Sequence, residues 1–152
     1  MLSRLFPRRL DNSYRGYKLA LVIFGLVALV RVAIGLGSIF NGYLAASSAD
    51  GIPLDTFPAA ATQTILSLFA MLGLSRLLLG LLCILVLIRY RAMVPLMFAV
   101  LLLEQLGRQL IVYFLPIPRV GAPPVSAIHL TILALLILGL ALSLLTRKPS
   151  TA

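Results

Sequence analysis

The chain has 152 residues, of which 61% are apolar and 11% charged, whereas about a quarter of the residues of a soluble domain are charged. Thirteen Lys and Arg against four Asp and Glu give a net charge of +9, which in so apolar a chain predicts basic loops facing anionic lipid and argues against nucleic acid as a partner. The composition therefore excludes an ordinary soluble protein, and at about 20 residues per crossing the length accommodates four membrane helices but no separate catalytic domain.

Four apolar stretches, at about residues 19–46, 58–88, 92–115 and 125–146, are each long enough to cross a bilayer. We therefore expect a single domain over residues 1–152, an all-α polytopic membrane protein. Its four helices are expected to form an antiparallel transmembrane bundle whose main partner is the lipid bilayer.

The first apolar stretch follows a basic segment and fades at Asn41, after which proline, glycine and small polar residues predict a loop over 41–57. A cleavable signal has an apolar region of about 7–15 residues. This stretch is well over twenty residues long and carries Arg31, so we expect it to remain as the first helix. In the loop, Asp50 and Asp55 are expected to be solvated turn residues.

The second stretch begins near Pro58, a residue suited to the first turn of a helix, and runs to Arg89. It is longer than a perpendicular crossing needs, so we expect it to tilt or to project from the membrane. The third stretch follows after almost no linker, which predicts a helical hairpin, and it ends at Pro116. The fourth begins after Pro124 and ends before Arg147.

The distribution of Lys and Arg predicts the orientation. The N-terminal segment, the 89–91 turn and the 147–148 tail hold nine of them, the 41–57 loop holds none, and the 116–124 loop holds only Arg119. Positive charge is retained on the cytoplasmic side, so we expect both termini to face the cytoplasm.

Four charged side chains lie inside the predicted spans: Arg31, Arg76, Glu104 and Arg108. Each costs about 2.5–3.5 kcal/mol at a helix centre on insertion scales, so such residues usually face the bundle interior and pair with one another. Counted from the helix ends, all four lie at overlapping depths between the midplane and the outer third of the bilayer. Arg108 follows Glu104 by one helical turn on the same face, with Gln105 and Gln109 beside them.

The faces that carry Arg31 and Arg76 also carry small residues, among them Gly35 and Gly80. Helices in lipid associate through such faces because their backbones can approach closely. We therefore expect both guanidinium groups at helix contacts, and all four charged side chains in one interior pocket.

Three interpretations of this cluster are open. It can be a structural polar clamp whose spare donors meet side chains, backbone carbonyls and trapped water. After Glu104 neutralises one arginine, the remaining +2 charge can instead bind an anion such as a lipid phosphate, a carboxylate or the polar head of a quinone. The cluster can also pair with an acidic helix of a partner subunit.

Other chemistry is not indicated. Cys83 is the only cysteine, so the chain alone cannot build an intrachain disulfide, a CxxC pair or a thiolate metal site. His129 is the only histidine and is expected to be an interfacial or hydrogen-bonded residue near the outer end of the last helix. Catalytic and phosphate-binding motifs are lacking, so enzymatic activity is unsupported. The chain has no second histidine and no Cys/His cluster, so no metal or haem is expected.

The residues of the cluster also carry a resemblance. The patterns Arg31-x-x-x-Gly35, Ser75-Arg76-x-x-x-Gly80 and Leu103-Glu104-Gln105-Leu106-Gly107-Arg108, in a chain of this length, resemble the small bacterial four-helix DoxX-like inner-membrane proteins. The resemblance covers residues 19–146. It implies a four-helix bundle in a bacterial inner (plasma) membrane, in some members as a small subunit associated with quinone-linked respiratory enzymes. It transfers no catalytic residue.

Two classes of function follow. The first is a non-enzymatic accessory subunit or lipid- or quinone-binding module built around the cluster, acting within a larger membrane complex or a homo-oligomer. The alternative is a small transporter or proton-coupled carrier that uses Glu104 and the arginines.

Overall fold

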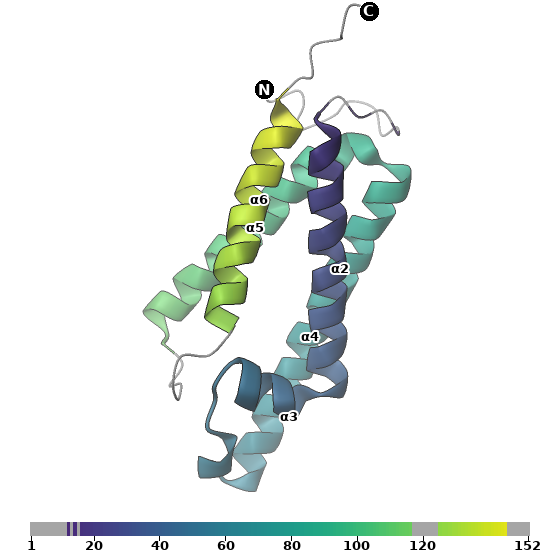
Figure 1. Cartoon of the computed structure of the whole chain (residues 1–152). Coiled ribbons are helices and arrows are strands. Elements are labelled where there is room, and N and C mark those ends of the chain that lie inside the picture. The colour runs from purple at the N-terminus through teal and green to yellow at the C-terminus, as the bar shows by residue number, and fades with distance from the viewer. Residues whose placement is uncertain (1–11, 13, 15, 117–124, 146–152) are drawn as a thin grey trace, which may run out of the picture.

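The computed structural model describes residues 12, 14, 16–116 and 125–145, and within these ranges all regular structure is helical (Figure 1). The elements are, in chain order, α2 (Lys18–Phe40), α3 (Gly42–Leu44), η1 (Ala45–Ala49), η2 (Leu54–Thr56), α4 (Ala59–Arg89), η3 (Arg91–Met93), α5 (Val94–Phe114) and α6 (Val125–Leu144). Four of these helices, with η3 continuing into α5, are long and apolar enough to cross a membrane. The predicted all-α class and the four spanning helices are confirmed.

Proline sets the start of two helices. Pro58 directly precedes α4, and Pro95 lies in the first turn of α5. The first N–H groups of a helix have no partner within the helix, so a residue without an N–H is tolerated there. Both starts lie within two residues of the sequence expectation. All of the predicted 116–124 loop except Pro116 lies outside the described residues, as do the basic residues beyond Leu145 and the four arginines before Lys18.

The first helix is shorter than expected, and the segment after it is more ordered. At Asn41 the backbone leaves the helical region, with φ −125° and ψ 45°, so α2 ends at Phe40 rather than near residue 46. The chain then resumes helix in α3 and in η1, a short π-helical turn. Gly51 lies two residues after η1 and has φ 72°, a conformation that strongly favours glycine. The predicted 41–57 loop is thus largely a folded unit.

This unit packs on the start of α4 and explains the length of that helix. Ala46, Ile52 and Leu54 are buried together, and side chains of α4, including Leu66 and Phe69, pack against them. At 1.5 Å per residue, the 31 residues of α4 span roughly 46 Å, well beyond a hydrocarbon core of about 30 Å. The first turns of α4 are therefore covered by the 41–57 segment.

The closest helix contact is between α2 and α4, and it depends on glycine. A Cβ added at Gly35 would lie 2.8 Å from the backbone N of Leu77 and 2.9 Å from the carbonyl O of Gly73. A Cβ added at Gly80 would lie 2.8 Å from Cγ2 of Val32. The predicted small-residue faces of Arg31 and Arg76 therefore do form a helix contact, and it holds both arginines close together.

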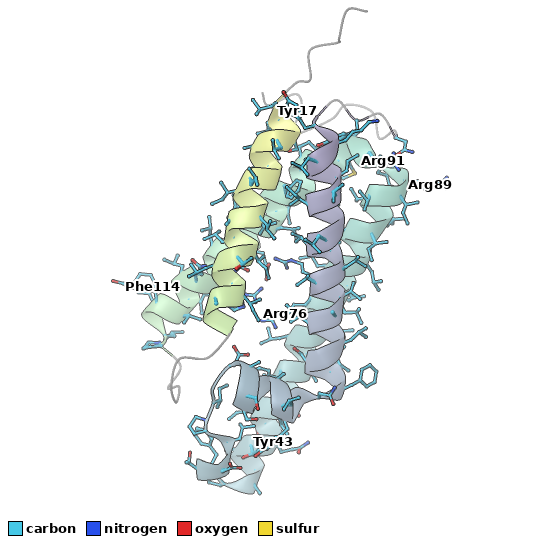
Figure 2. The ribbon with its side chains drawn as sticks, in the orientation of Figure 1. Tyr17, Tyr43, Arg76, Arg89, Arg91 and Phe114 are labelled. Carbon is cyan, nitrogen blue, oxygen red and sulfur yellow. The ribbon has the colours of Figure 1, made fainter. Side chains whose placement is uncertain are left out.

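The other pairs of helices make unequal contacts. α6 packs on α2 and on α5, whereas α4 and α5 make little contact and diverge from the short turn that joins them (Figure 1). An apolar core, in which the rings of Phe24 and Phe98 meet edge to face at 5.1 Å, fills the bundle between α2, α4, α5 and α6. Tyr17, Arg89 and Arg91 lie at one end of the molecule, and Tyr43 lies at the opposite end (Figure 2).

Candidate functional site

Glu104 is the centre of the charged cluster. Its Oε2 lies 2.6 Å from Nη2 of Arg31, which is an ion pair across the bundle from α5 to α2. Its Oε1 accepts a hydrogen bond from Nη2 of Arg108, one turn further along α5. One carboxylate therefore holds two guanidinium groups, and the predicted Glu104–Arg108 pair is present together with an interhelical pair that sequence spacing does not give.

Arg31 is the most deeply buried of the cluster. The residue is only 4% exposed. Its Nε is a buried donor that has no hydrogen-bond partner among the described residues. A buried polar group without a partner costs about 1–3 kcal/mol, more for a charged group. Arg31 therefore has unused hydrogen-bonding capacity inside the bundle.

Two cavities adjoin the cluster and have five lining residues in common. The first, of about 490 Å³, is lined by α2, α5 and α6, by Arg76 of α4, and by the segment of α3 and η1, and we call it the capped cavity. The second, of about 660 Å³, is lined mainly by α4 and α5, with further lining residues from α2, α6 and the 41–57 segment, and we call it the lateral cavity. Both volumes fall in the range of about 300–1,000 Å³ typical of small-molecule sites. The residues common to the two cavities are Arg31, Asp50, Arg76, Arg108 and His129.

Arg76 reaches this site from α4. It is partly buried and its charge interacts with Arg31, Asp50, Glu104 and Arg108. In Figure 2 it lies in the middle of the molecule, at the level of the space between α2 and α6. All four intramembrane charges predicted to converge therefore line the lateral cavity.

Asp50 is the residue that sequence reasoning missed. We expected a solvated turn residue, but Asp50 is only partly exposed, lines both cavities and interacts electrostatically with Arg76. The expectation was wrong because the 41–57 segment folds under the bundle instead of extending into solvent. Asp55 is exposed as expected, and its Oδ1 accepts a hydrogen bond of 2.6 Å from the Tyr43 hydroxyl.

Asp50 also changes the charge of the site. Three arginines and two carboxylates leave one net positive charge with His129 neutral, in place of the +2 expected from the spans alone. The two carboxylates belong to different parts of the fold, because Glu104 lies in α5 and Asp50 directly follows η1. The net charge of the cavity is therefore set jointly by a membrane helix and by the segment that caps it.

The secondary polar residues lie around the same cavities. Gln105 is 2% exposed, lines the capped cavity, and donates a long hydrogen bond of 3.4 Å from Nε2 to the carbonyl O of His129. Gln109 lines the lateral cavity. His129 lines both, so it belongs to the polar site rather than to the outer surface alone. Each predicted site residue is thus placed at one or both cavities.

The donor set determines what the site can hold. Within the described residues no three His, Cys, Asp or Glu side chains lie close enough to hold a metal ion. Cys83 is buried in the apolar core. What the site offers instead is guanidinium N–H groups in a cavity whose remaining lining is largely apolar, which suits an anionic or hydrogen-bond-accepting head attached to an apolar body. No family model, curated protein or solved structure matches this chain.

Proposed function

We propose that this protein is a small, non-enzymatic membrane module that binds the polar head of an anionic lipid or a quinone in the Arg/Glu cluster, as an accessory subunit of a membrane complex. The observation that carries the proposal is the convergence of three guanidinium groups, those of Arg31, Arg76 and Arg108, on the lateral cavity, whose lining has a net charge of +1. An anionic or hydrogen-bond-accepting head group in this cavity would meet these donors. Because the site lies within the spans, its ligand must itself enter a membrane.

The resemblance to DoxX-like proteins is a second support for the proposal. It supports the assignment to a bacterial inner membrane and the association with a larger complex or a second copy of the chain. The arrangement of charge supports both termini facing the cytoplasm, because Arg89 and Arg91 lie at the end of the molecule opposite to Tyr43 (Figure 2), whose hydroxyl donates a hydrogen bond to Asp55. An antiparallel four-helix bundle is the topology consistent with that orientation.

Cysteine labelling tests the orientation. In a Cys83→Ala background, a cysteine at exposed Thr56 should react with an impermeant thiol reagent on intact cells. A cysteine at exposed Arg91 should react only after permeabilisation. Labelling of the cysteine at position 91 in intact cells contradicts the proposed orientation.

Native mass spectrometry of the protein purified in mild detergent tests the binding. We expect lipid, quinone or a partner subunit to co-purify with the wild-type chain and to be reduced in Arg76→Gln. The matched control is Arg89→Gln, which removes an exposed arginine from the end of the same helix. Equal ligand content in both variants contradicts a role of the cluster in binding.

The alternative function is a proton-coupled carrier. His129 and Glu104 both line the lateral cavity, and titratable groups along a cavity are what such a carrier requires. However, both oxygens of Glu104 lie in ion pairs with guanidinium groups, so a carrier would have to open this arrangement in every cycle. Substrate flux in proteoliposomes that is abolished by Glu104→Gln would favour the carrier over the binding module.

A further inference from the structure

The lateral cavity lies between two helices that diverge. α4 and α5 leave their connecting turn in different directions and make little contact further along (Figure 1). Leu72 on α4 and Ile111 on α5 line this cavity and are 55% and 61% exposed. In a bilayer these exposed apolar side chains face lipid, so the cavity is reached from the hydrocarbon phase between α4 and α5.

The capped cavity reaches the same arginines from the side of the 41–57 segment. The capped cavity is lined by Leu44, Ala45 and Ala49 of α3 and η1. This segment is held by its own small core, in which Ala46 and Leu54 are buried. The same segment contributes Asp50 and Ile52 to the lining of the lateral cavity, so it borders both cavities.

The lining separates a polar end from an apolar passage. Arg31, Arg76 and Arg108 provide the polar end, with one net positive charge once Glu104 and Asp50 are counted. The passage is lined by Leu72 and Leu79 of α4 and by Ile111 and Val112 of α5. The matching ligand therefore carries one negative charge at the end of an apolar chain.

The depth of the site favours a small head on a single chain. Arg31 lies 13 residues from Lys18, and Arg76 lies 13 residues from Arg89, which is roughly 20 Å along each helix. A diacyl phospholipid would have to bring its glycerol unit and two chains to that depth. A carboxylate brings only two oxygens, which match the planar fork of a guanidinium group.

We propose that the ligand of this site is a long-chain monocarboxylate, with its carboxylate between Arg31 and Arg76 and its chain in the lateral cavity between α4 and α5. The assignment rests on the proposed anion-binding function and specifies its ligand class. The carboxylate accepts hydrogen bonds from the guanidinium groups of Arg31 and Arg76, both of which line this cavity.

The test uses the full chain in nanodiscs of zwitterionic phosphatidylcholine, with palmitate as the probe. Methyl palmitate has the same chain without the charge and serves as the control ligand. We expect saturable binding of palmitate and at least about tenfold weaker binding of the ester, because hydrogen bonds to charged groups are worth a factor of about ten or more. Equal binding of acid and ester overturns the carboxylate assignment.

Substitutions of Arg76 test the binding of the carboxylate, and a substitution of Leu79 tests the passage of the chain between α4 and α5. Arg76→Gln should weaken palmitate binding about tenfold or more, while Arg89→Gln should leave it unchanged. If Arg76→Gln does not fold, Arg76→Lys keeps the charge and loses the planar fork, and binding unaltered by this variant overturns the assignment. Leu79→Trp should obstruct the lateral cavity, whereas Leu78→Trp, at a residue that is 59% exposed and outside the lining, should not.

The same assay with phosphatidylglycerol and with a quinone separates this inference from the proposed function. If either of these binds in an Arg76-dependent manner and palmitate does not, the monocarboxylate assignment is wrong and the anion-binding module stands. If none of the three binds, both are wrong. If palmitate binds and both tryptophan variants bind it equally, the passage between α4 and α5 is wrong.

Discussion

Replacing Glu104 by glutamine is the most direct perturbation of the cluster, because one carboxylate holds two arginines. The variant keeps the size and a polar oxygen of the side chain but removes the charge that Arg31 and Arg108 share. Arg31 is then a buried cation without its counterion. Removing one partner of a buried ion pair costs about 3–5 kcal/mol in soluble proteins.

The Arg31 pair should dominate that cost. The side chain of Arg31 is 5% exposed, whereas that of Arg108 is 24% exposed and can reorient toward water or lipid head groups. We therefore expect Glu104→Gln to lower the free energy of unfolding by about 3–5 kcal/mol, or roughly 6–20 °C in unfolding temperature for a chain of this size. Asp55→Asn is the matched control, since this acid is exposed and lies outside the spans, and it should cost less than about 1 kcal/mol.

A double-mutant cycle decides whether the ion pair causes the loss. Arg31→Met should be costly in the wild-type background but much less so in Glu104→Gln, because there it removes an uncompensated buried charge. Arg108→Met should show weaker coupling to Glu104. Thermal unfolding in detergent, followed by circular dichroism, measures all of these variants. Additive effects of Arg31→Met and Glu104→Gln would refute the reasoning, because residues that interact directly are not additive.

Two further predictions concern the helix contact and the segment outside the spans. Gly35→Ala should cost about 1–3 kcal/mol because its Cβ would lie 2.8 Å from the backbone N of Leu77, whereas Gly37→Ala, with nothing within 4 Å, should change stability by less than about 0.5 kcal/mol. The pKa of Tyr43 is raised above its usual 10.0 by its hydrogen bond to Asp55 and by the charge of that carboxylate. Asp55→Asn should lower this pKa toward 10.0 in an NMR titration of labelled tyrosine. Since the folded-state pKa is raised, the contact should stabilise the fold below pH 10 and lose its effect as the pH rises through the raised value. An unchanged Tyr43 titration in Asp55→Asn, or equal stability of the two glycine variants, would contradict these accounts.

The spans and the convergence of charge are predictable from sequence because both follow from the cost of placing groups in hydrocarbon. Apolar length alone locates the four helices, and prolines at 58 and 95 fix two of their starts. Charged groups at similar depth have few alternatives to meeting inside the bundle. The small residues next to Arg31 and Arg76 indicate which faces approach, and the contact of Gly35 with the backbone of α4 agrees with that pattern.

The position of Asp50 is not predictable in the same way, because it depends on the backbone conformation of the residues around it. The chain leaves the helix at Asn41, and Gly51 has a positive φ. Neither residue type dictates the direction that the chain takes next. A signal was nevertheless present. Ile52 and Leu54 alternate with less apolar residues, and two apolar side chains spaced in this way in a polar segment indicate a buried edge.

The divergence of α4 and α5 has a similar cause. A short connection requires two helices to be neighbours at one end only, and packing decides the rest. α2 occupies the small-residue face of α4, where Gly73 and Gly80 allow close approach. α5 packs instead on α6, where Phe98 approaches Gly139 so closely that an added Cβ would lie 2.4 Å from its ring. The connection length therefore could not predict the lateral cavity.

The two carboxylates of the site depend on different parts of the fold, which has a physical consequence for its charge. Glu104 is part of α5 and forms ion pairs with both Arg31 and Arg108. Asp50 directly follows η1, in a segment whose own core consists of Ala46, Ile52 and Leu54 with side chains of α4 packed against it. A segment with few buried apolar contacts opens at a lower free energy than the core of the same protein. Local opening of this segment would withdraw the carboxylate of Asp50 from the cavity while the Arg31–Glu104 pair between α2 and α5 stays in place, so the lining of the cavity would become more positive.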